Sequence, residues 1–273
     1  MFLKALILLA TVAAGALAQL TPKCPSADLN SCTYQYFSNF LNYPHTDNNT
    51  LVWTDYSTFI NFTDQLVTQN VGDPSGLITV CNALEQTEGC LAAKTDRCFG
   101  PLAFLLRGND ATTSFTFSGL FNLYKFRCGA GLYTVIRENL SCVQRTLWNQ
   151  RNILWGCLNT YQNNVAHDPA GSCNYVQAYT SCYSAVFNRS SCGFAGSADH
   201  WWACEGAYQF TLTQFPNCYL SCSREFGPPG FSEYLETHVK VENGRTWFKL
   251  PNIWRQINNE WKFVENDWVT GEQ

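Results

Sequence analysis

The sequence lacks the motifs that identify common classes of enzyme. It holds no Gly-x-Ser-x-Gly elbow, no His-Glu-x-x-His pair and no glycine-rich phosphate loop. Histidine occurs only four times. His167 precedes an Asp-Pro pair that is typical of a turn, and His200 stands beside two tryptophans at an expected helix start. We therefore expect no catalytic residues and no cofactor.

Long apolar runs are missing after the N-terminus. Residues 1–18 combine Lys4 with an apolar core and end in Ala16-Leu17-Ala18, a pattern that indicates a secretory signal peptide cut before Gln19. The core is shorter than the roughly 20 residues that a membrane-spanning helix needs. We expect a secreted, extracellular protein without a membrane span.

Cysteine, in contrast, is abundant. All 14 cysteines follow the expected signal peptide, and an even number in a secreted chain predicts disulfide bonds, here up to seven. The paired short spacings of structural zinc sites are missing, so we expect no metal site. The spacing leaves the disulfide pairing open. The predicted disulfide residues are Cys24, Cys32, Cys81, Cys90, Cys98, Cys128, Cys142, Cys157, Cys173, Cys182, Cys192, Cys204, Cys218 and Cys222.

Four Asn-x-Ser/Thr sequons predict N-glycosylation. They begin at Asn48, Asn61, Asn139 and Asn188, and any that carries sugar must face solvent. The formal net charge of −4 argues against a nucleic acid or an anionic lipid surface as partner. An extracellular protein or a glycan fits the composition better.

Residues 19–226 have the pattern of a disulfide-stapled helical body. Apolar residues recur there at steps of three and four, which predicts a mainly α fold. Leu29, Cys32, Tyr36 and Phe40 form one such face. Segments starting near residues 81 and 173 share a Cys-Asn pair followed, after seven residues, by cysteine. A pseudo-repeat and a coincidence both explain this similarity.

A Pro/Gly-rich stretch at 226–231 marks a predicted boundary, beyond which residues 227–273 form a cysteine-free, Trp-rich tail. Asn243-Gly244 is a strong signal for a two-residue β-hairpin turn. Such a turn would place Glu242 opposite Arg245, and Lys240 opposite Trp247.

The tail also contains a tryptophan every seven residues. Because Pro251 can begin a helix but not continue one, we expect a short amphipathic helix over about 252–269, which makes the tail a small α+β unit. The apolar stripe along this helix could pack on the body, bind a protein or peptide, or bind a glycan. Its residues are Trp254, Ile257, Trp261, Val264 and Trp268.

The cysteine rhythm between residues 117 and 222 carries a family resemblance. "FSGLFNLYKFRC", "ENLSCVQ" and "CNYVQAYTSC" resemble secreted cysteine-rich domains of nematodes, of the chondroitin-proteoglycan type and related domains of unknown function. The resemblance implies a helical disulfide domain in an extracellular or matrix setting.

Three functions follow as hypotheses. The first is a secreted, N-glycosylated, non-catalytic protein that binds a partner or contributes to a matrix, and it predicts an exposed aromatic patch. The second is an extracellular carrier of a small apolar ligand, with a closed apolar pocket that lacks converging charges. The third is a divergent secreted hydrolase, with His167 or His200 in a cleft and bonded to a carboxylate.

Overall fold

The computed structural model describes residues 24–44, 52–189, 198–220 and 222, with tail segments at 239–243, 245–249, 253–257, 260–264 and 268–270. Over these residues the chain is mainly helical, which confirms the predicted fold class of the body. The expected signal peptide at 1–18 and the expected boundary at 226–231 lie outside the described residues. None of the helices in the described residues has the length and apolar character needed to cross a bilayer.

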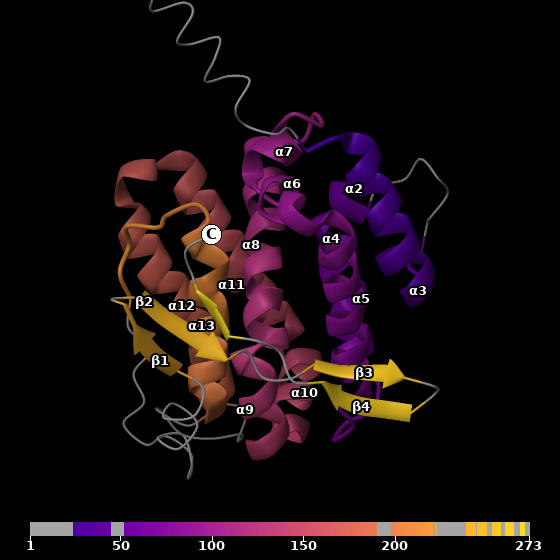
Figure 1. The fold of residues 1–273 in the computed structure, drawn as a ribbon. Helices are drawn as coiled ribbons and strands as arrows, with labels where there is room; N and C mark the ends of the chain where they lie inside the picture. The colour runs from indigo at the N-terminus through magenta and orange to yellow at the C-terminus, as the bar shows by residue number, and fades with distance from the viewer. Residues whose placement is uncertain are drawn as a thin grey trace, which may run out of the picture.

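The helices fall into two groups along the chain. Helices α2 to α5 lie on one side of the central helix α8, α11 to α13 lie on the other, and α9 and α10 lie near its lower end (Figure 1). The first group comprises α2 (Ser26–Thr33), α3 (Asn39–Leu41), α4 (Tyr56–Thr68), α5 (Ser75–Leu91), α6 (Thr95–Cys98) and α7 (Pro101–Leu105). The central helix α8 spans Ala111–Cys128. The second group is α9 (Ala130–Glu138), α10 (Leu140–Asn149), α11 (Arg151–His167), α12 (Ser172–Arg189) and α13 (Ala198–Leu212). Short 3₁₀ turns span Val52–Thr54, Ala92–Lys94 and Pro169–Gly171.

Helix α4 begins at a capped position. The Asp55 carboxylate accepts hydrogen bonds from the backbone N–H groups of Ser57 and Thr58, as expected of an N-cap aspartate. Side-chain hydrogen bonds from the same two residues lower the pKa of Asp55 to about 2. The cap therefore contributes stability at neutral pH, and this contribution is lost as the pH falls through the lowered pKa.

The helical face predicted near the N-terminus is only partly right. Leu29 and Cys32 are buried, but Phe40 is 42% exposed, and Phe37 is fully buried in its place. The cause is a π-helical turn over Tyr34–Ser38, whose wider turn shifts the face that meets the core. A regular 3.6-residue period cannot predict that shift.

One hydrophobic core runs through both groups of helices. In the first group, Trp53 lies between aromatic rings, with Phe59 at 5.4 Å and Phe117 at 5.7 Å between ring centroids. Its indole N–H donates to Thr33 Oγ1 at 2.8 Å, so the polar end of this buried ring is satisfied.

Helix α8 joins this core to the second group by a close approach to α13. A Cβ atom on Gly119 would lie 2.5 Å from the carbonyl oxygen of Phe210, so only glycine permits this crossing. The contact fixes Phe210 against α8.

Six disulfide bonds lie within the described residues, so the protein is disulfide-rich, as predicted. This chemistry fits an oxidising, extracellular setting. The bonds are Cys24–Cys98, Cys32–Cys90, Cys81–Cys128, Cys157–Cys182, Cys173–Cys218 and Cys204–Cys222. Cys142 is also disulfide-bonded, and Cys192 lies outside the described residues.

The two similar segments pair in the same manner. Cys81 and Cys173 each bond forward, to cysteines 47 and 45 residues later. Cys90 and Cys182 each bond backward, to an earlier helix. That α5 and α12 are corresponding helices of a pseudo-repeat stays a prediction.

The described segments of the tail form five strands: β1 (Val239–Glu242), β2 (Arg245–Lys249), β3 (Ile253–Ile257), β4 (Glu260–Val264) and β5 (Trp268–Thr270). β1 and β2 are antiparallel, with Glu242 opposite Arg245 and Lys240 opposite Trp247. β5 pairs with β2, and β3 pairs with β4. Strand β3 contacts α5 at the lower end of that helix (Figure 1).

The amphipathic helix expected over 252–269 is wrong, because strands β3 and β4 occupy much of that range. Each of the strands β2 to β5 holds one tryptophan, so the seven-residue period is the step from one short strand to the next. Aromatic and β-branched residues favour such strands over a helix. Trp254, Ile257, Trp261, Val264 and Trp268 therefore form no helical stripe.

Gln144 on α10 binds the end of α4 and the turn that follows it through its side-chain amide. Its Nε2 donates to the carbonyl oxygens of Val67 at 2.8 Å and Asp73 at 2.9 Å, and its Oε1 accepts from Gly72 N at 2.6 Å. The side chain is fully buried. Gln144 thus replaces water for one carbonyl at the end of α4 and for two backbone groups of the turn between α4 and α5.

Gln144→Leu keeps a similar size but removes all three hydrogen bonds. Because one buried and two partly buried backbone groups lose their partners, we expect the free energy of unfolding to fall by about 3 kcal/mol, measured by chemical denaturation with the disulfides intact. Gln86→Leu, at an exposed position on α5, is the control and should change it by less than about 0.5 kcal/mol. Equal effects of the two substitutions would contradict this role of Gln144.

Candidate functional site

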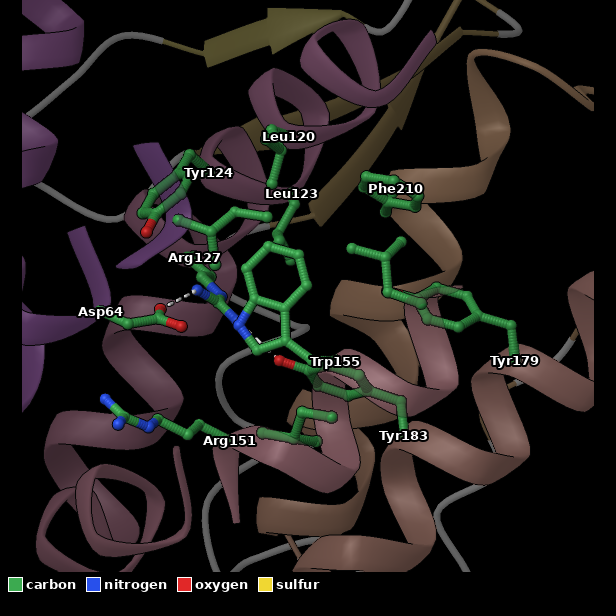
Figure 2. Close-up of a pocket in the computed structure, with 13 residues that line it drawn as sticks. Asp64, Leu120, Leu123, Tyr124, Arg127, Arg151, Trp155, Tyr179, Tyr183 and Phe210 are labelled. Atoms are coloured by element: carbon green, nitrogen blue, oxygen red, sulfur yellow. Dashed lines mark hydrogen bonds and ion pairs between the residues drawn. The ribbon is translucent and has the colours of Figure 1, made fainter. Parts of the chain in front are cut away.

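A small cavity lies where α4, α8, α11, α12 and α13 meet. Its volume is about 50 Å³. Figure 2 shows two unlike sides. Asp64 and Arg151 lie on one side, near Arg127, and Tyr179 and Phe210 lie on the other. The cavity is therefore amphipathic, with charged groups facing an aromatic wall.

Arg127 is the central polar residue of this cavity. It lies in the last turn of α8, where a positive charge is favoured by the helix dipole. The residue is only 4% exposed. Its guanidinium lies over the rings of Tyr124, at 5.3 Å, and Trp202, at 4.9 Å. Two aromatic faces thus hold a buried cation.

Two polar groups from other helices also approach Arg127. Its Nη2 donates to the hydroxyl of Tyr183 on α12 at 3.1 Å, and its Nη1 lies 3.5 Å from Asp64 Oδ1 on α4. A direct charge-assisted bond is usually about 2.7–2.9 Å long, so the Asp64 contact is a loose one. Asp64 keeps 23% of its side chain exposed and so remains partly hydrated.

Burial sets the protonation of these groups. It raises the pKa of Asp64, and the nearby Arg127 only partly opposes that rise. Burial alone would lower the pKa of Arg127, but Tyr183, Tyr124 and Asp64 raise it above its usual value. Burial also raises the pKa of both tyrosines. At neutral pH, Arg127 is therefore charged and the tyrosine hydroxyls are neutral.

Arg127 retains unused donor capacity. A guanidinium carries five N–H donors, and the buried Nε of Arg127 has no hydrogen-bond partner among the described residues. A buried donor without a partner costs free energy, so the described side chains do not fully replace the hydration of Arg127.

Arg151 and Trp155 form the outer side of the lining. Arg151 is exposed at the start of α11, and its guanidinium lies 5.0 Å from the ring of Trp148. Trp155 stacks on Tyr56 at 6.5 Å. Two arginines and one aspartate line the cavity, which gives a formal charge of +1 when all three are ionised.

The two histidines considered from the sequence lie elsewhere. His167 is exposed, and its Nδ1 lies 2.7 Å from the backbone carbonyl oxygen of Asn163. His200 is half-buried on α13, and burial lowers its pKa. Neither residue lines the cavity. The carboxylate of Asp168 accepts a hydrogen bond from the hydroxyl of Tyr175, at 2.9 Å.

Of the predicted disulfide cysteines, 12 form the six disulfide bonds described for the fold. The strands of the tail contain the predicted stripe residues, whose side chains lie outside the description. Asn48 and the side chain of Asn188 also lie outside it. Within the described chain, no three His, Cys, Asp or Glu residues gather as metal ligands would.

The cavity was not predicted from the sequence. Its only sequence signal was the placement of Arg127 next to the aromatic face of "FSGLFNLYKFRC". A lone arginine at the end of a helix is usually exposed, so this signal alone did not indicate a site.

Comparison with known proteins yields no relative. No protein-family profile matches the chain, and no curated protein or solved structure is significantly similar to it. The resemblance to nematode cysteine-rich domains therefore remains a prediction, and the function must be argued from the cavity itself.

The two described sequons differ in accessibility. Asn61 is exposed on α4. Asn139 is half-buried between α9 and α10, and its Nδ2, the atom that would carry the sugar, donates to Oδ2 of the buried Asp199 at 3.0 Å.

We therefore predict that Asn61 is glycosylated and Asn139 is not. Asn61→Gln should remove one glycan from the secreted protein, seen as a faster band that enzymatic deglycosylation makes identical to the wild type. Asn139→Gln should leave the glycan mass unchanged. A glycan at Asn139, found by peptide mass spectrometry, would contradict the prediction.

Proposed function

We propose that this protein is a secreted, disulfide-stapled binding protein that holds a small ligand in the Arg127 cavity and performs no catalysis. The observation that supports it best is a buried guanidinium, with one N–H donor unused, at a cavity inside a crosslinked helical body. Disulfides beside Arg127 and Tyr183, at Cys128 and Cys182, limit how far the walls can move. Such preorganisation favours binding.

The chemistry of the cavity supports binding over proton transfer. Arginine stays protonated in proteins and supplies charge and hydrogen bonds, so Arg127 suits recognition better than acid–base catalysis. The hydrolase hypothesis required a histidine bonded to a carboxylate in a cleft. His167 contacts a backbone carbonyl on the surface instead, which gives that hypothesis no support.

The carrier of a purely apolar ligand is a weaker candidate. That hypothesis required a closed pocket without converging charges, whereas Asp64, Arg127 and Arg151 all line this cavity. An engineered apolar cavity that accepts benzene measures about 150 Å³, three times the volume found here. A small, partly polar ligand fits better than a large apolar one.

Secretion, N-glycosylation and the tail belong to the same proposal. Disulfide content and the sequence of residues 1–18 support secretion. The tail is proposed as a small β unit that follows the helical body, and its strand β3 contacts α5. A matrix or protein-binding role of the tryptophan-containing strands is the second candidate, favoured by the recurrence of tryptophan in four successive strands.

The proposal predicts that the protein carries a ligand from its native extracellular fluid. Wild-type protein is incubated in that fluid, repurified and denatured, and the released small molecules are compared by mass spectrometry with those from Ile60→Phe. Ile60 lines the cavity at a half-buried position, so the larger ring should occupy it and remove the ligand.

The matched control is Ile153→Phe, because Ile153 is 53% exposed on α11 and does not line the cavity. We expect wild type and Ile153→Phe to release the same molecule and Ile60→Phe to release none. If the three proteins release the same set, or none releases any, the cavity is not a binding site and the proposal is wrong.

A further inference from the structure

We propose that the Arg127 cavity recognises a short aliphatic monocarboxylate, such as a three-carbon acid. This inference rests on the proposed binding function and adds the chemical class of the ligand. Three features of the cavity carry it: its charge, its two-sided lining and its volume.

The charge of the lining selects an anion. Arg127 and Arg151 both face the cavity and only Asp64 offsets them. The Asp64–Arg127 contact is 3.5 Å long, so the carboxylate of Asp64 leaves some of the charge of Arg127 uncompensated. The Nε donor without a partner belongs to the same buried guanidinium. Guanidinium groups match carboxylate oxygens in geometry as well as charge.

The opposite wall selects an apolar substituent on that anion. Leu123, Tyr179 and Phe210 line this side, and Figure 2 shows the two rings across the cavity from Asp64. All three side chains are 8% exposed or less. A carboxylate near Arg127 would therefore extend its alkyl group over buried apolar side chains, where burial of each methylene favours binding.

The volume limits the length of the ligand. A cavity of about 50 Å³ is a third of the roughly 150 Å³ that accommodates the six carbons of benzene. Only a few heavy atoms can enter, and the rest must lie at the mouth beside Arg151. A three-carbon acid meets this limit, whereas a long-chain fatty acid does not.

The test uses matched three-carbon probes with the secreted, disulfide-bonded protein. Binding of 3,3,3-trifluoropropionate is followed by the ¹⁹F line width, and propionate, 1-propanol and propylammonium are added as competitors at pH 7. We expect propionate to compete at least about tenfold better than propanol, since a charged hydrogen bond is lost with the alcohol. Propylammonium should not compete.

Two variants of lining residues, each with a matched control outside the cavity, locate the site without changing Arg127 or Asp64. Arg151→Gln should weaken propionate binding about fivefold, as expected for a partly exposed charge contact. Arg145→Gln removes an exposed arginine outside the cavity and should leave the affinity unchanged. Ile60→Phe should abolish binding, and Ile153→Phe should retain it. Equal affinities for all four variants would overturn the assignment.

A further competitor separates a free acid from the end of a peptide chain. N-acetyl-alanyl-alanine carries the same carboxylate on a larger body, which the small cavity should exclude, so it should compete at least about tenfold less well than propionate. Stronger competition by the peptide would overturn the proposed class, because the site would then recognise a chain terminus.

The outcomes also separate this inference from the proposed function. If propanol or propylammonium competes as well as propionate, the carboxylate class is wrong but the cavity still binds small molecules. If trifluoropropionate fails to bind while a native ligand still depends on Ile60, the class is again wrong and the binding function stands. If no probe binds and no native ligand is released, both are wrong.

Discussion

The burial of one positive charge, on Arg127, constrains how helices α4, α8, α12 and α13 pack together. Removing a guanidinium from water costs several kcal/mol unless partners replace its hydration. Here the partners come from four helices: Asp64 from α4, Tyr124 from α8 itself, Tyr183 from α12 and Trp202 from α13. These helices must converge at Arg127 for the charge to be tolerated.

Small residues make this convergence possible. A Cβ atom on Gly131 would lie 2.9 Å from Nε1 of Trp202, so a larger residue at the start of α9 would displace the ring that covers Arg127. Gly119 likewise permits the close contact between α8 and the backbone of Phe210. The cavity between Arg127 and Phe210 is thus bounded by two close helix contacts.

Disulfide bonds hold the same region from outside. Cys128 follows Arg127, Cys182 precedes Tyr183 and Cys157 precedes Leu158, another residue of the lining. The bond at Cys128 joins α8 to α5, and the bond between Cys157 and Cys182 joins α11 to α12. The walls are therefore fixed by covalent links as well as by packing. A ligand would bind a preorganised site, so little conformational entropy would be lost on binding.

The sequence could predict the helical body and the disulfide chemistry, because both follow from local features: apolar steps of three and four, and an even number of cysteines. It could not predict the cavity, because Asp64, Arg127 and Tyr183 are brought together only by the packing of α4, α8 and α12. The prediction of a helix in the tail was wrong for a different reason. A seven-residue tryptophan period fits a heptad helix, but it fits a series of short strands equally well, and Trp254 and Trp261 lie on paired strands.

The role of Arg127 is tested most directly by the NMR signal of its Nε–H in protein labelled with ¹⁵N-arginine. The signal is assigned through bonds from the backbone of Arg127. We predict a signal that is protected from solvent exchange, because the Nε is buried, and that shifts when propionate is added but not when propylammonium is added. Rapid solvent exchange of the Nε–H, or a signal that does not shift when a carboxylate is added, would contradict the claim that a buried arginine with a spare donor is the centre of the binding site.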